Sequence, residues 1–460
     1  MKSLAALSTL VAAATAASVA GASSKRVSYD GTKVFRLSVG DEVDRVNGVV
    51  DKLQLTTWKG APRAGAFADI VVPATEVESF KAEVAGMNLT TMHEDLGASI
   101  ADESGFSVYA GKSRHLSKAG CLSTYATRPS HADAISQYAK VRQLTFLSVG
   151  SANATWFNSY HAYADHLQFL KDLVSSYPSN AEIVTSGSSL QGNAITGIHI
   201  YGTSKGTKPA VVFHSTVHAR EWISTMANEY IAWNLLSKYS SDTEIKSFVD
   251  KYDFYIFPVV NPDGFIYTQT TNRLWRKNRQ STSGSTCIGH DINRNWPFQW
   301  SVTGGASTDP CAEDFKGLSQ GDAPETAALS AWLAKTKSAQ GLKLFIDFHA
   351  YSQLFMTPYG YSCTAVSAKN TELQSLAKGA VAAIKAVHGT SYQYGPICTT
   401  IYKATGSSVD YVNDVVKADY TFTQELRDTG NYGFVLPAAQ IVPTSEETYA
   451  GVRYLLQNMK

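Results

Sequence analysis

Two histidines and a glutamate have the residue types and positions of a metal site in this 460-residue chain. His218 and Glu221 lie three positions apart in the stretch VVFHSTVHAREW, where an apolar strand-like run gives way to a helical pattern. His349 closes another apolar run, in the motif DFHAYSQ. Imidazole nitrogens and carboxylate oxygens are ligands that Zn²⁺ prefers, and two histidines with one glutamate leave the fourth position open to water. The pattern therefore predicts a catalytic rather than a structural zinc site.

Each of these residues has a simpler interpretation when it is taken alone. A histidine and a glutamate three apart at the start of a helix are more often a solvated pair or a helix cap than metal ligands. His349 alone is typical of a hydrogen-bonded core histidine. The metal interpretation therefore depends on what the rest of the chain adds.

Further candidates for chemistry come from three motifs: NRLWRKNR at 272–279, DINRNW at 291–296 and FTQELRDTG at 422–430. Arg294 offers a planar, permanently charged fork which, with the Asn293 amide, suits the terminal carboxylate of a peptide. Arg276 can polarise a scissile carbonyl and stabilise the oxyanion that forms. Glu425 can serve as a general base beside the metal.

Alternatives remain open for these motifs as well. The cluster of Arg273, Arg276, Lys277 and Arg279 around Trp275 is also typical of a solvated basic loop or a small nucleic-acid patch. Glu425 could form a salt bridge to Arg427.

Six motifs in this order resemble those of the zinc metallocarboxypeptidases of the pancreatic carboxypeptidase A and B type: HAREW, NRLWRKNR, DINRNW, DFHAYSQ, IYKATGSSVD and ELRDTG. The resemblance covers the chain from about Ser159 to the C-terminus. The segment from Lys33 to Asp95 is similar, more loosely, to the activation propeptide of these enzymes. The family uses a zinc site of two histidines and one glutamate, for which carboxypeptidase A is a standard example.

The resemblance implies a proenzyme that hydrolyses the C-terminal peptide bond with a zinc-activated water, one Zn²⁺ per catalytic domain and a glutamate general base. It implies His218, Glu221 and His349 as zinc ligands, Arg276 as the carbonyl and oxyanion partner, Arg273 as a substrate-subsite residue, Asn293, Arg294 and Tyr402 as the carboxylate-binding set, and Glu425 as the base.

The resemblance also bears on specificity. The floor of the family's pocket matches Val409, and the position beside the base matches Thr423. An uncharged floor disfavours a lysine or arginine side chain because its cation would be buried unpaired. We therefore expect a preference for aromatic or branched aliphatic C-terminal residues. Asp410 is adjacent and acidic, so a shift of one residue would give the B-like preference for Lys or Arg.

Two functions of other classes would use only part of this set of residues. A secreted binding protein on a catalytically dead scaffold would be expected to lack Glu425 or a zinc ligand, and both are intact. A zinc hydrolase acting on other amides, such as cell-wall peptides, would not need the complete carboxylate-binding set.

The elements that must position these residues alternate between strands and helices. Strand-like runs occur at 182–185, 195–200, 210–214, 254–260, 344–348 and 420–422, and helical patterns at 323–335, 372–387 and 446–459. This order indicates an α/β fold with a mixed, mostly parallel central sheet and helices on both faces. In such sheets the ligand site lies at the carboxyl ends of the strands, where His218, His349 and Glu425 fall. The 33–95 segment reads as strand, helix, strand, helix, strand, which predicts a small ferredoxin-like α+β domain.

Composition excludes partners that are chosen by an overall charge. Forty basic and thirty-nine acidic residues leave a net charge of +1, so we expect no nucleic-acid or membrane partner. Residues 1–20 have the pattern of a cleaved signal peptide, and no later stretch is apolar enough to span a bilayer. We expect a secreted, extracellular monomer whose partners are peptide or protein C-termini and an activating endoprotease.

The five cysteines agree with secretion. None forms a close CxxC pair, so two disulfides are expected among the four that are well spaced, with three possible pairings. The shorter closures, Cys287 with Cys311 and Cys363 with Cys398, are favoured, and the family resemblance implies the same pairs. Asn88 and Asn153 lie in glycosylation sequons.

The predicted organisation has four parts: a signal peptide at 1–20, an activation propeptide domain at 21–96, a connector with the activation cleavage at 97–154, and a catalytic domain at 155–460. The connector contains scattered Lys and Arg residues, as expected of an exposed segment that proteases can cut, and it also contains Cys121, the odd one of the five cysteines.

Overall fold

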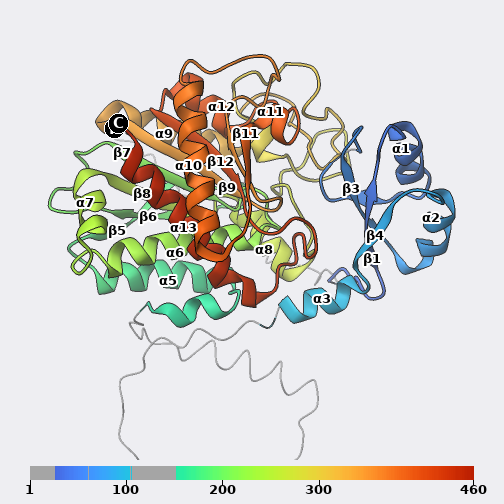
Figure 1. Cartoon of the computed structure of the whole chain (residues 1–460), viewed down its shortest axis with the longest axis horizontal. Helices are drawn as coiled ribbons and strands as arrows, with labels where there is room; N and C mark the ends of the chain where they lie inside the picture. The colour runs from blue at the N-terminus through green and yellow to red at the C-terminus, as the bar shows by residue number, and fades with distance from the viewer. Residues whose placement is uncertain (1–25, 61, 104, 106–151) are drawn as a thin grey trace, which may run out of the picture.

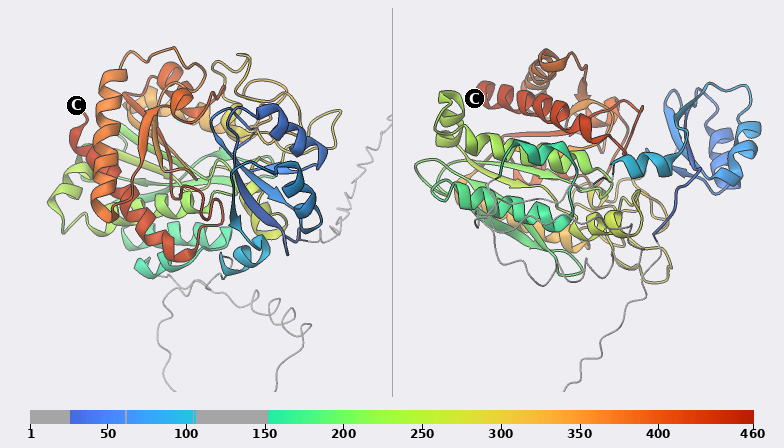
Figure 2. Two further views of the ribbon diagram at one scale, coloured as in Figure 1. Left: turned by 45° about the vertical axis from the view of Figure 1, so that its right-hand side comes forward. Right: turned by 90° about the horizontal axis from the view of Figure 1, so that it is seen from below.

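The computed structural model describes residues 26–60, 62–103, 105 and 152–460, which form a small N-terminal domain packed against one side of a large domain (Figures 1 and 2). The predicted signal peptide, Cys121 and the stretch 106–151 of the predicted connector lie outside the described residues. Among the described residues, no helix has both the length and the apolar character required to cross a bilayer.

The small domain is an antiparallel sheet covered by two helices. Its strands are β1 (Lys33–Ser38), β2 (Thr56–Thr57), β3 (Phe67–Val72) and β4 (Leu89–His93), in the order β2-β3-β1-β4. The helices are α1 (Val43–Lys52) and α2 (Val77–Glu83). Side chains of β1 and β3 alternate, so that Phe35, Ile70 and Phe80 of α2 share one core. A third helix, α3 (Leu96–Glu103), leads from this domain toward the large one.

The large domain is built on an eight-stranded mixed sheet. Its strands are β5 (Ala181–Ser188), β6 (Ala194–Ile200), β7 (Ala210–Ser215), β8 (Asp253–Phe257), β9 (Leu342–His349), β10 (Leu354–Thr357), β11 (Gln393–Pro396) and β12 (Tyr420–Glu425). The strand order is β11-β10-β12-β9-β7-β8-β6-β5, and the central strands β12, β9, β7 and β8 are parallel. These results confirm the predicted α/β fold with a mostly parallel sheet.

Helices cover both faces of this sheet. The helices are α5 (Tyr163–Ser176), α6 (Trp222–Ser237), α7 (Thr243–Lys251), α8 (Pro262–Thr270), α9 (Pro324–Gln340), α10 (Asn370–His388), α11 (Ile397–Thr400), α12 (Ser408–Tyr411) and α13 (Ile441–Asn458). One core lies between the sheet and α5, α6, α10 and α13, and a second lies between the opposite face and α9 and α12.

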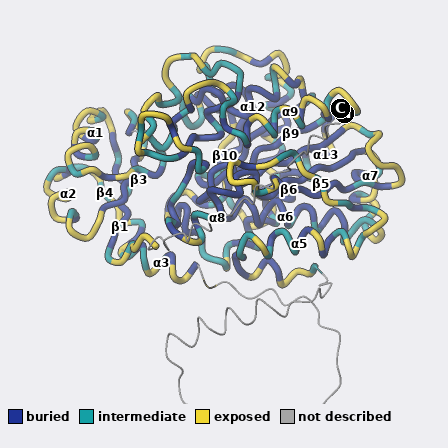
Figure 3. Tube along the Cα trace, turned by 180° about the vertical axis from the view of Figure 1, so that it is seen from behind, coloured by how far each residue is buried: buried dark blue, intermediate teal, exposed yellow. Residues whose placement is uncertain are grey.

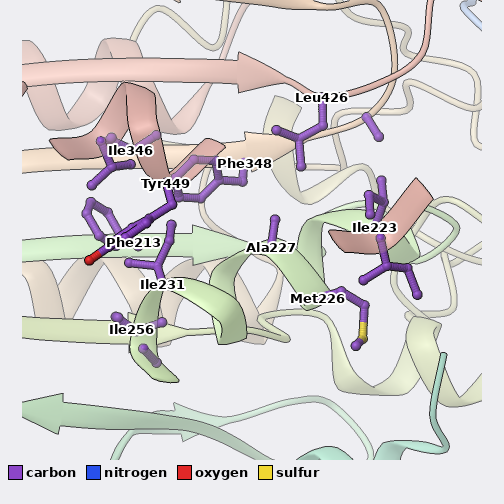
Figure 4. Packing of buried hydrophobic residues seen from close by; sticks show 14 of the residues in the cluster. Phe213, Ile223, Met226, Ala227, Ile231, Ile256, Ile346, Phe348, Leu426 and Tyr449 are labelled. Atoms are coloured by element: carbon purple, nitrogen blue, oxygen red, sulfur yellow. The ribbon is translucent and has the colours of Figure 1, made fainter. Parts of the chain in front are cut away.

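The central strands are buried on both faces, which explains the apolar runs of β7 and β8. All six residues of β7 are buried, and Val211 and Phe213 join one core while Val212 joins the other. In Figure 4, Phe213, Ile256 and Ile346 from three adjacent strands point toward residues of α6. Figure 3 shows that the central strands are buried, whereas α1 and α2 of the small domain expose their outer sides. The site is therefore carried by a rigid, fully packed sheet.

Candidate active site

The three predicted metal ligands meet at the carboxyl end of two adjacent parallel strands. His218 follows β7, His349 is the last residue of β9, and Glu221 immediately precedes α6. His218 Nδ1 lies 2.7 Å from Glu221 Oε1, and His349 Nδ1 lies 3.0 Å from Glu221 Oε2 and 3.1 Å from His218 Nδ1. All three side chains are buried, and one ligand atom from each lies within 4.8 Å of the others. The residues present therefore fit a divalent cation.

The orientation of the two imidazoles supports this fit. Both histidines turn Nδ1 toward the cluster and Nε2 away from it. His218 Nε2 lies 3.2 Å from Asp291 Oδ1, and His349 Nε2 lies 3.3 Å from Asp347 Oδ2. A carboxylate behind each ring keeps the proton on Nε2, so that the Nδ1 lone pair is free for a metal.

Charges around the cluster keep its acids ionised. Burial opposes the charge of Glu221, but His218 and His349 outweigh burial and hold the pKa of this carboxyl well below its usual range. Burial likewise opposes the charge of Asp291, and Arg276 with His218 lowers its pKa well below the ordinary value. Arg276 donates from Nη2 to Asp291 Oδ2 at 2.8 Å, and its Nη1 lies 4.0 Å from Glu221 Oε1. Arg276 is therefore a fixed cation at the edge of the cluster.

Glu425 lies beside the cluster but has different electrostatics. It ends β12 and is the register partner of His349 on β9, which explains its position. Burial and the nearby Glu221 carboxylate raise the pKa of Glu425 to about 7. The alternative salt bridge to Arg427 is wrong, because Arg427 donates from Nε to Glu447 at 2.8 Å. A carboxylate with a raised pKa beside a metal site has the properties of a general base.

A small cavity of about 40 Å³ opens next to Glu425 and the histidines. Its apolar lining is Met356, Ile397, Ile401, Ala404 and Val409, and its polar lining includes Asn293, Arg294, Tyr402 and Thr423. The three residues predicted to bind a carboxylate, Asn293, Arg294 and Tyr402, therefore line one cavity. Arg294 is buried, and its Nε has no hydrogen-bond partner among the described residues. A buried, unpartnered guanidinium donor beside an apolar cavity suits an anionic group of a ligand.

Asp410 does not line this cavity. Its carboxylate is buried and accepts hydrogen bonds from the backbone N–H groups of Gly360 and Tyr361, each at 3.0 Å. Burial raises the pKa of Asp410 to about 7. The charge of Asp410 is therefore turned toward the backbone, and Val409 is the residue that faces the cavity.

The small domain lies over the entrance to the site through the loop between β2 and β3. The Trp58 ring packs against Tyr351 and Phe434, with centroid distances of 6.1 Å and 5.3 Å, and its carbonyl accepts from Arg220 at 2.9 Å. The Arg63 guanidinium lies 4.0 Å from the centroid of the Tyr402 ring. A cleft of about 870 Å³ remains between this loop and the large domain, lined in part by Arg63, Arg294 and Tyr402.

The basic cluster of 273–279 is largely enclosed rather than exposed. Arg273 is 1 % exposed and forms a two-pronged ion pair with Glu103 of α3, at 2.6 Å and 2.7 Å. Lys277 donates to the carbonyls of Pro310 and Ala312. Arg273, Arg276 and Lys277 therefore do not form a solvated loop or nucleic-acid patch. The predicted substrate-subsite residue Arg273 is occupied by the small domain.

Four residues near the site received no role from the sequence. Arg220 contacts the small domain, Asp291 and Asp347 stand behind the histidines, and Ser408 donates to Asp347. Asp291 and Asp347 are each a few residues from a predicted site residue, in DINRNW and DFH. A carboxylate two positions before a ligand histidine on one strand was a signal that could have identified Asp347.

The remaining predicted residues are four cysteines and two sequon asparagines. Disulfides join Cys287 to Cys311 and Cys363 to Cys398, as predicted. Asn88 and Asn153 are exposed, as a glycosylation acceptor must be. Asn153 Oδ1 also accepts a hydrogen bond from the Thr155 N–H at 2.9 Å. Glycosylation at either asparagine stays a prediction.

Comparisons with known proteins agree with this geometry. Residues 166–451 match the zinc carboxypeptidase family, and residues 38–103 match the carboxypeptidase activation peptide. The chain is 45% identical over 463 residues, covering 100% of both chains, to a metallocarboxypeptidase A-like protein of Trichophyton verrucosum (strain HKI 0517). It is 34% identical to carboxypeptidase A1 of Bos taurus, covering 95% of this chain and 96% of that protein.

A solved structure has the same two-domain arrangement. The crystal structure of thrombin activatable fibrinolysis inhibitor superposes with a TM-score of 0.79 at 26% identity, covering 94% of this chain and 99% of that one. With the family matches over both domains, these likenesses show that the chain belongs to the zinc carboxypeptidase family and is a metallocarboxypeptidase made with an activation peptide.

Proposed function

We propose that the chain is a secreted proenzyme which, after removal of its activation domain, releases single residues from peptide C-termini and prefers aromatic or branched aliphatic ones. The observation that supports this most strongly is the meeting of His218, Glu221 and His349 beside Glu425 and an apolar cavity. A cluster of potential ligands that adjoins both a candidate base and a pocket is the arrangement of a catalytic rather than a structural site.

We assign the zinc to His218, Glu221 and His349. Zinc bound there would polarise the scissile carbonyl and make a water molecule more acidic. Glu425 takes a proton from the attacking water and passes it to the departing amine. Arg276, which keeps its charge through Asp291, binds the developing oxyanion. Removing the Arg276 charge should therefore lower kcat more than it raises KM.

The carboxylate of the substrate is assigned to Asn293, Arg294 and Tyr402, which share the cavity with Val409 and Thr423. The unpartnered Nε of Arg294 supplies a donor, and Tyr402 lies in the segment between α11 and α12. Arg273 is assigned to an upstream substrate residue and becomes accessible only when Glu103 leaves.

The apolar lining of the cavity favours the A-type preference over the B-type. Met356, Ile397, Ile401 and Val409 offer no partner for a cation, and Asp410 is turned away. An unpaired cation in such a cavity loses its hydration without compensation. The same side chains gain free energy from burial of an apolar substrate residue, about 25 cal/mol per Å² of apolar surface.

The activation arrangement is assigned as a propeptide at 21–96, a connector with the cleavage site at 97–154 and a catalytic domain at 155–460. Residues 1–20 are assigned as a signal peptide, which is why we propose secretion. We propose that the active enzyme is a monomer.

The test is release of the C-terminal residue from N-blocked dipeptides after proteolytic removal of the activation domain. We expect Phe to be released faster than Arg, and a zinc chelator to abolish both reactions. Faster release of Arg would favour the B-type alternative. Absence of any release from a folded, zinc-loaded chain would favour the alternative of a catalytically dead binding protein.

A further inference from the structure

Behind the candidate metal site lies Asp347, a buried carboxylate whose Oδ1 has no hydrogen-bond partner among the described residues. It lies on β9 two residues before His349, so both side chains are on the same side of the strand. The side chain is 0 % exposed, although a carboxylate is costly to bury without partners. Its Oδ2 accepts from the Ser408 hydroxyl and lies 3.3 Å from His349 Nε2.

A second polar group also faces His349 Nε2, namely the side-chain amide of Asn293. Its Nδ2 lies 3.3 Å from that ring nitrogen, and its Oδ1 accepts from the Ser408 N–H at 2.9 Å. The Ser408 contact fixes which end of the amide faces the ring, because the N–H can only be met by the oxygen. The Asn293 amide therefore presents a donor to His349, not an acceptor.

This geometry leaves one acceptor for His349. When Nδ1 gives its lone pair to a metal, Nε2 carries the proton and must donate it. The NH₂ group of Asn293 cannot accept that proton, whereas Asp347 Oδ2 can. Resting on the zinc assignment of the preceding section, we propose that Asp347 is a positioning residue that orients His349 and strengthens its bond to zinc.

The contacts of Asp347 extend this role to the substrate cavity. Its backbone carbonyl accepts from Thr423 Oγ1 at 3.0 Å, and Ser408, which holds its carboxylate, precedes Val409 in α12. Thr423 and Val409 both line the cavity. Asp347 thus contacts both His349 and residues that hold the lining of the proposed substrate cavity.

Each histidine of the cluster has an aspartate behind it, but the two aspartates have different partners. Asp291 lies behind His218 and is also bound by Arg276. Asp347 has no arginine or lysine partner among the described residues, so more of its charge acts on His349. Partners of this kind raise ligand basicity, and their loss costs about 10–100-fold in metal affinity.

The test measures the zinc dissociation constant of the full-length chain by competition with a chromophoric chelator. Asp347→Asn keeps the size of the side chain and removes its charge, and we expect it to weaken zinc binding about 10–100-fold. We also expect a changed visible absorption spectrum of the Co²⁺-substituted protein. After removal of the activation domain, activity should recover when free zinc is buffered at a saturating concentration, which loss of folding would not permit.

Asp253→Asn is the matched control. Asp253 is an equally buried strand aspartate that pairs with a histidine, His199, at 2.9 Å, but it lies outside the metal cluster. We expect Asp253→Asn to lower the thermal unfolding temperature and to leave the zinc dissociation constant within about twofold of the original. Equal weakening of zinc binding in both variants would overturn the proposal, because it would reveal a general effect of core damage.

An unchanged zinc affinity in a folded Asp347→Asn variant would also overturn the proposal. If that variant does not fold, Ser408→Ala serves instead, because it keeps the charge of Asp347 but removes the hydroxyl that holds the carboxylate in position against His349. Zinc binding should then weaken measurably, and an unchanged dissociation constant would refute the role. Failure of the zinc assignment itself has a different signature: the unaltered chain would bind no zinc, or His349→Ala would bind it as tightly.

Discussion

At the scale of single residues, burial and neighbouring charge give similar carboxylates opposite properties. Glu221 lies between two imidazoles and is held ionised, whereas Glu425 lies beside Glu221 and has a pKa raised to about 7. Pairs of acids with diverging pKa values are typical of sites where one group binds and the other transfers protons.

Glu425→Gln should lower kcat by about 10²–10⁴-fold, because the amide cannot accept a proton. The zinc content should not change, since Glu425 is not assigned as a ligand. Steady-state kinetics and metal analysis of the activated enzyme test this. Glu447→Gln is the control: it removes the carboxylate partner of Arg427 and should lower stability without a comparable loss of kcat. A Glu425→Gln enzyme with unchanged kcat would contradict the assignment.

The pH dependence of kcat/KM should follow the ionisation of Glu425. Only the carboxylate form accepts a proton, so kcat/KM should rise with pH and level off above the pKa. Burial and Glu221 place that pKa at about 7, and the positive charge of bound zinc lowers it, so the acid limb should lie at or below pH 7. A rate profile collected with a parallel stability profile tests this. Activity that stays level down to about pH 4, near the ordinary glutamate pKa, would exclude Glu425 as the base.

At the scale of elements, the parallel arrangement of the central strands brings distant residues together. His218, His349 and Glu425 follow or end the adjacent strands β7, β9 and β12, so strand register determines their proximity. Short α12 then positions Val409 toward the cavity and Asp410 toward the backbone of 360–361. Adjacent residues of a helix point in different directions, which is why one pocket position can be apolar beside a buried acid.

Val409→Asp should therefore change the preference of the enzyme. With a substrate that ends in Arg, a carboxylate at the cavity wall would pair with the substrate cation. With a substrate that ends in Phe, the same carboxylate would be buried without a partner. We expect the ratio of kcat/KM for C-terminal Phe over Arg to fall about 100-fold. Val409→Ala is the matched control, since it keeps the wall uncharged and should keep Phe ahead of Arg. No change in the ratio for Val409→Asp would show that this residue does not face the substrate.

Much of this arrangement was predictable from the sequence, for reasons that particular residues make clear. Buried parallel strands such as 210–213 have continuous apolar sequences, and the candidate metal residues His218 and Glu221 follow that strand closely. Helix α8 was not predicted, because its start, Asn261-Pro262-Asp263-Gly264, has the composition of a turn. The Asn261 side chain instead caps the helix by accepting from the Gly264 N–H. The roles of Asp347 and Ser408 depend on long-range contacts and could not be read from local spacing.

At the scale of the whole molecule, the activation domain and the α3 helix that follows it contact two of the assigned substrate residues, Tyr402 and Arg273. Trp58 lies on Tyr351 and Phe434, Arg63 on Tyr402, and Glu103 on Arg273. Figure 2 shows this domain against the same side of the large domain in both views. The contacts are made by the β2–β3 loop and by α3, so the activation domain, which covers the site, is held at two places.

Trp58→Ala should weaken this cover and raise the activity of the uncleaved chain on a small blocked dipeptide. Loss of a buried tryptophan costs about 3–5 kcal/mol, and each 1.4 kcal/mol removed from docking increases the open fraction about tenfold. We expect at least a tenfold gain in rate, measured before any proteolysis. Lys81→Ala, on the exposed side of α2, should give no gain. Equal rates for the Trp58→Ala and unaltered chains would contradict a role for Trp58 in the cover.

The buried pair of Glu103 and Arg273 has a consequence for the timing of events after proteolysis. A nick anywhere in 106–151 leaves Glu103 on the fragment that also carries the folded N-terminal sheet. We expect the cut chain to hold together without a covalent link, so that Arg273 keeps its counter-ion until that fragment diffuses away. We therefore expect the onset of peptidase activity to depend on dilution and on the lifetime of a two-chain complex, and not on the speed of the protease alone.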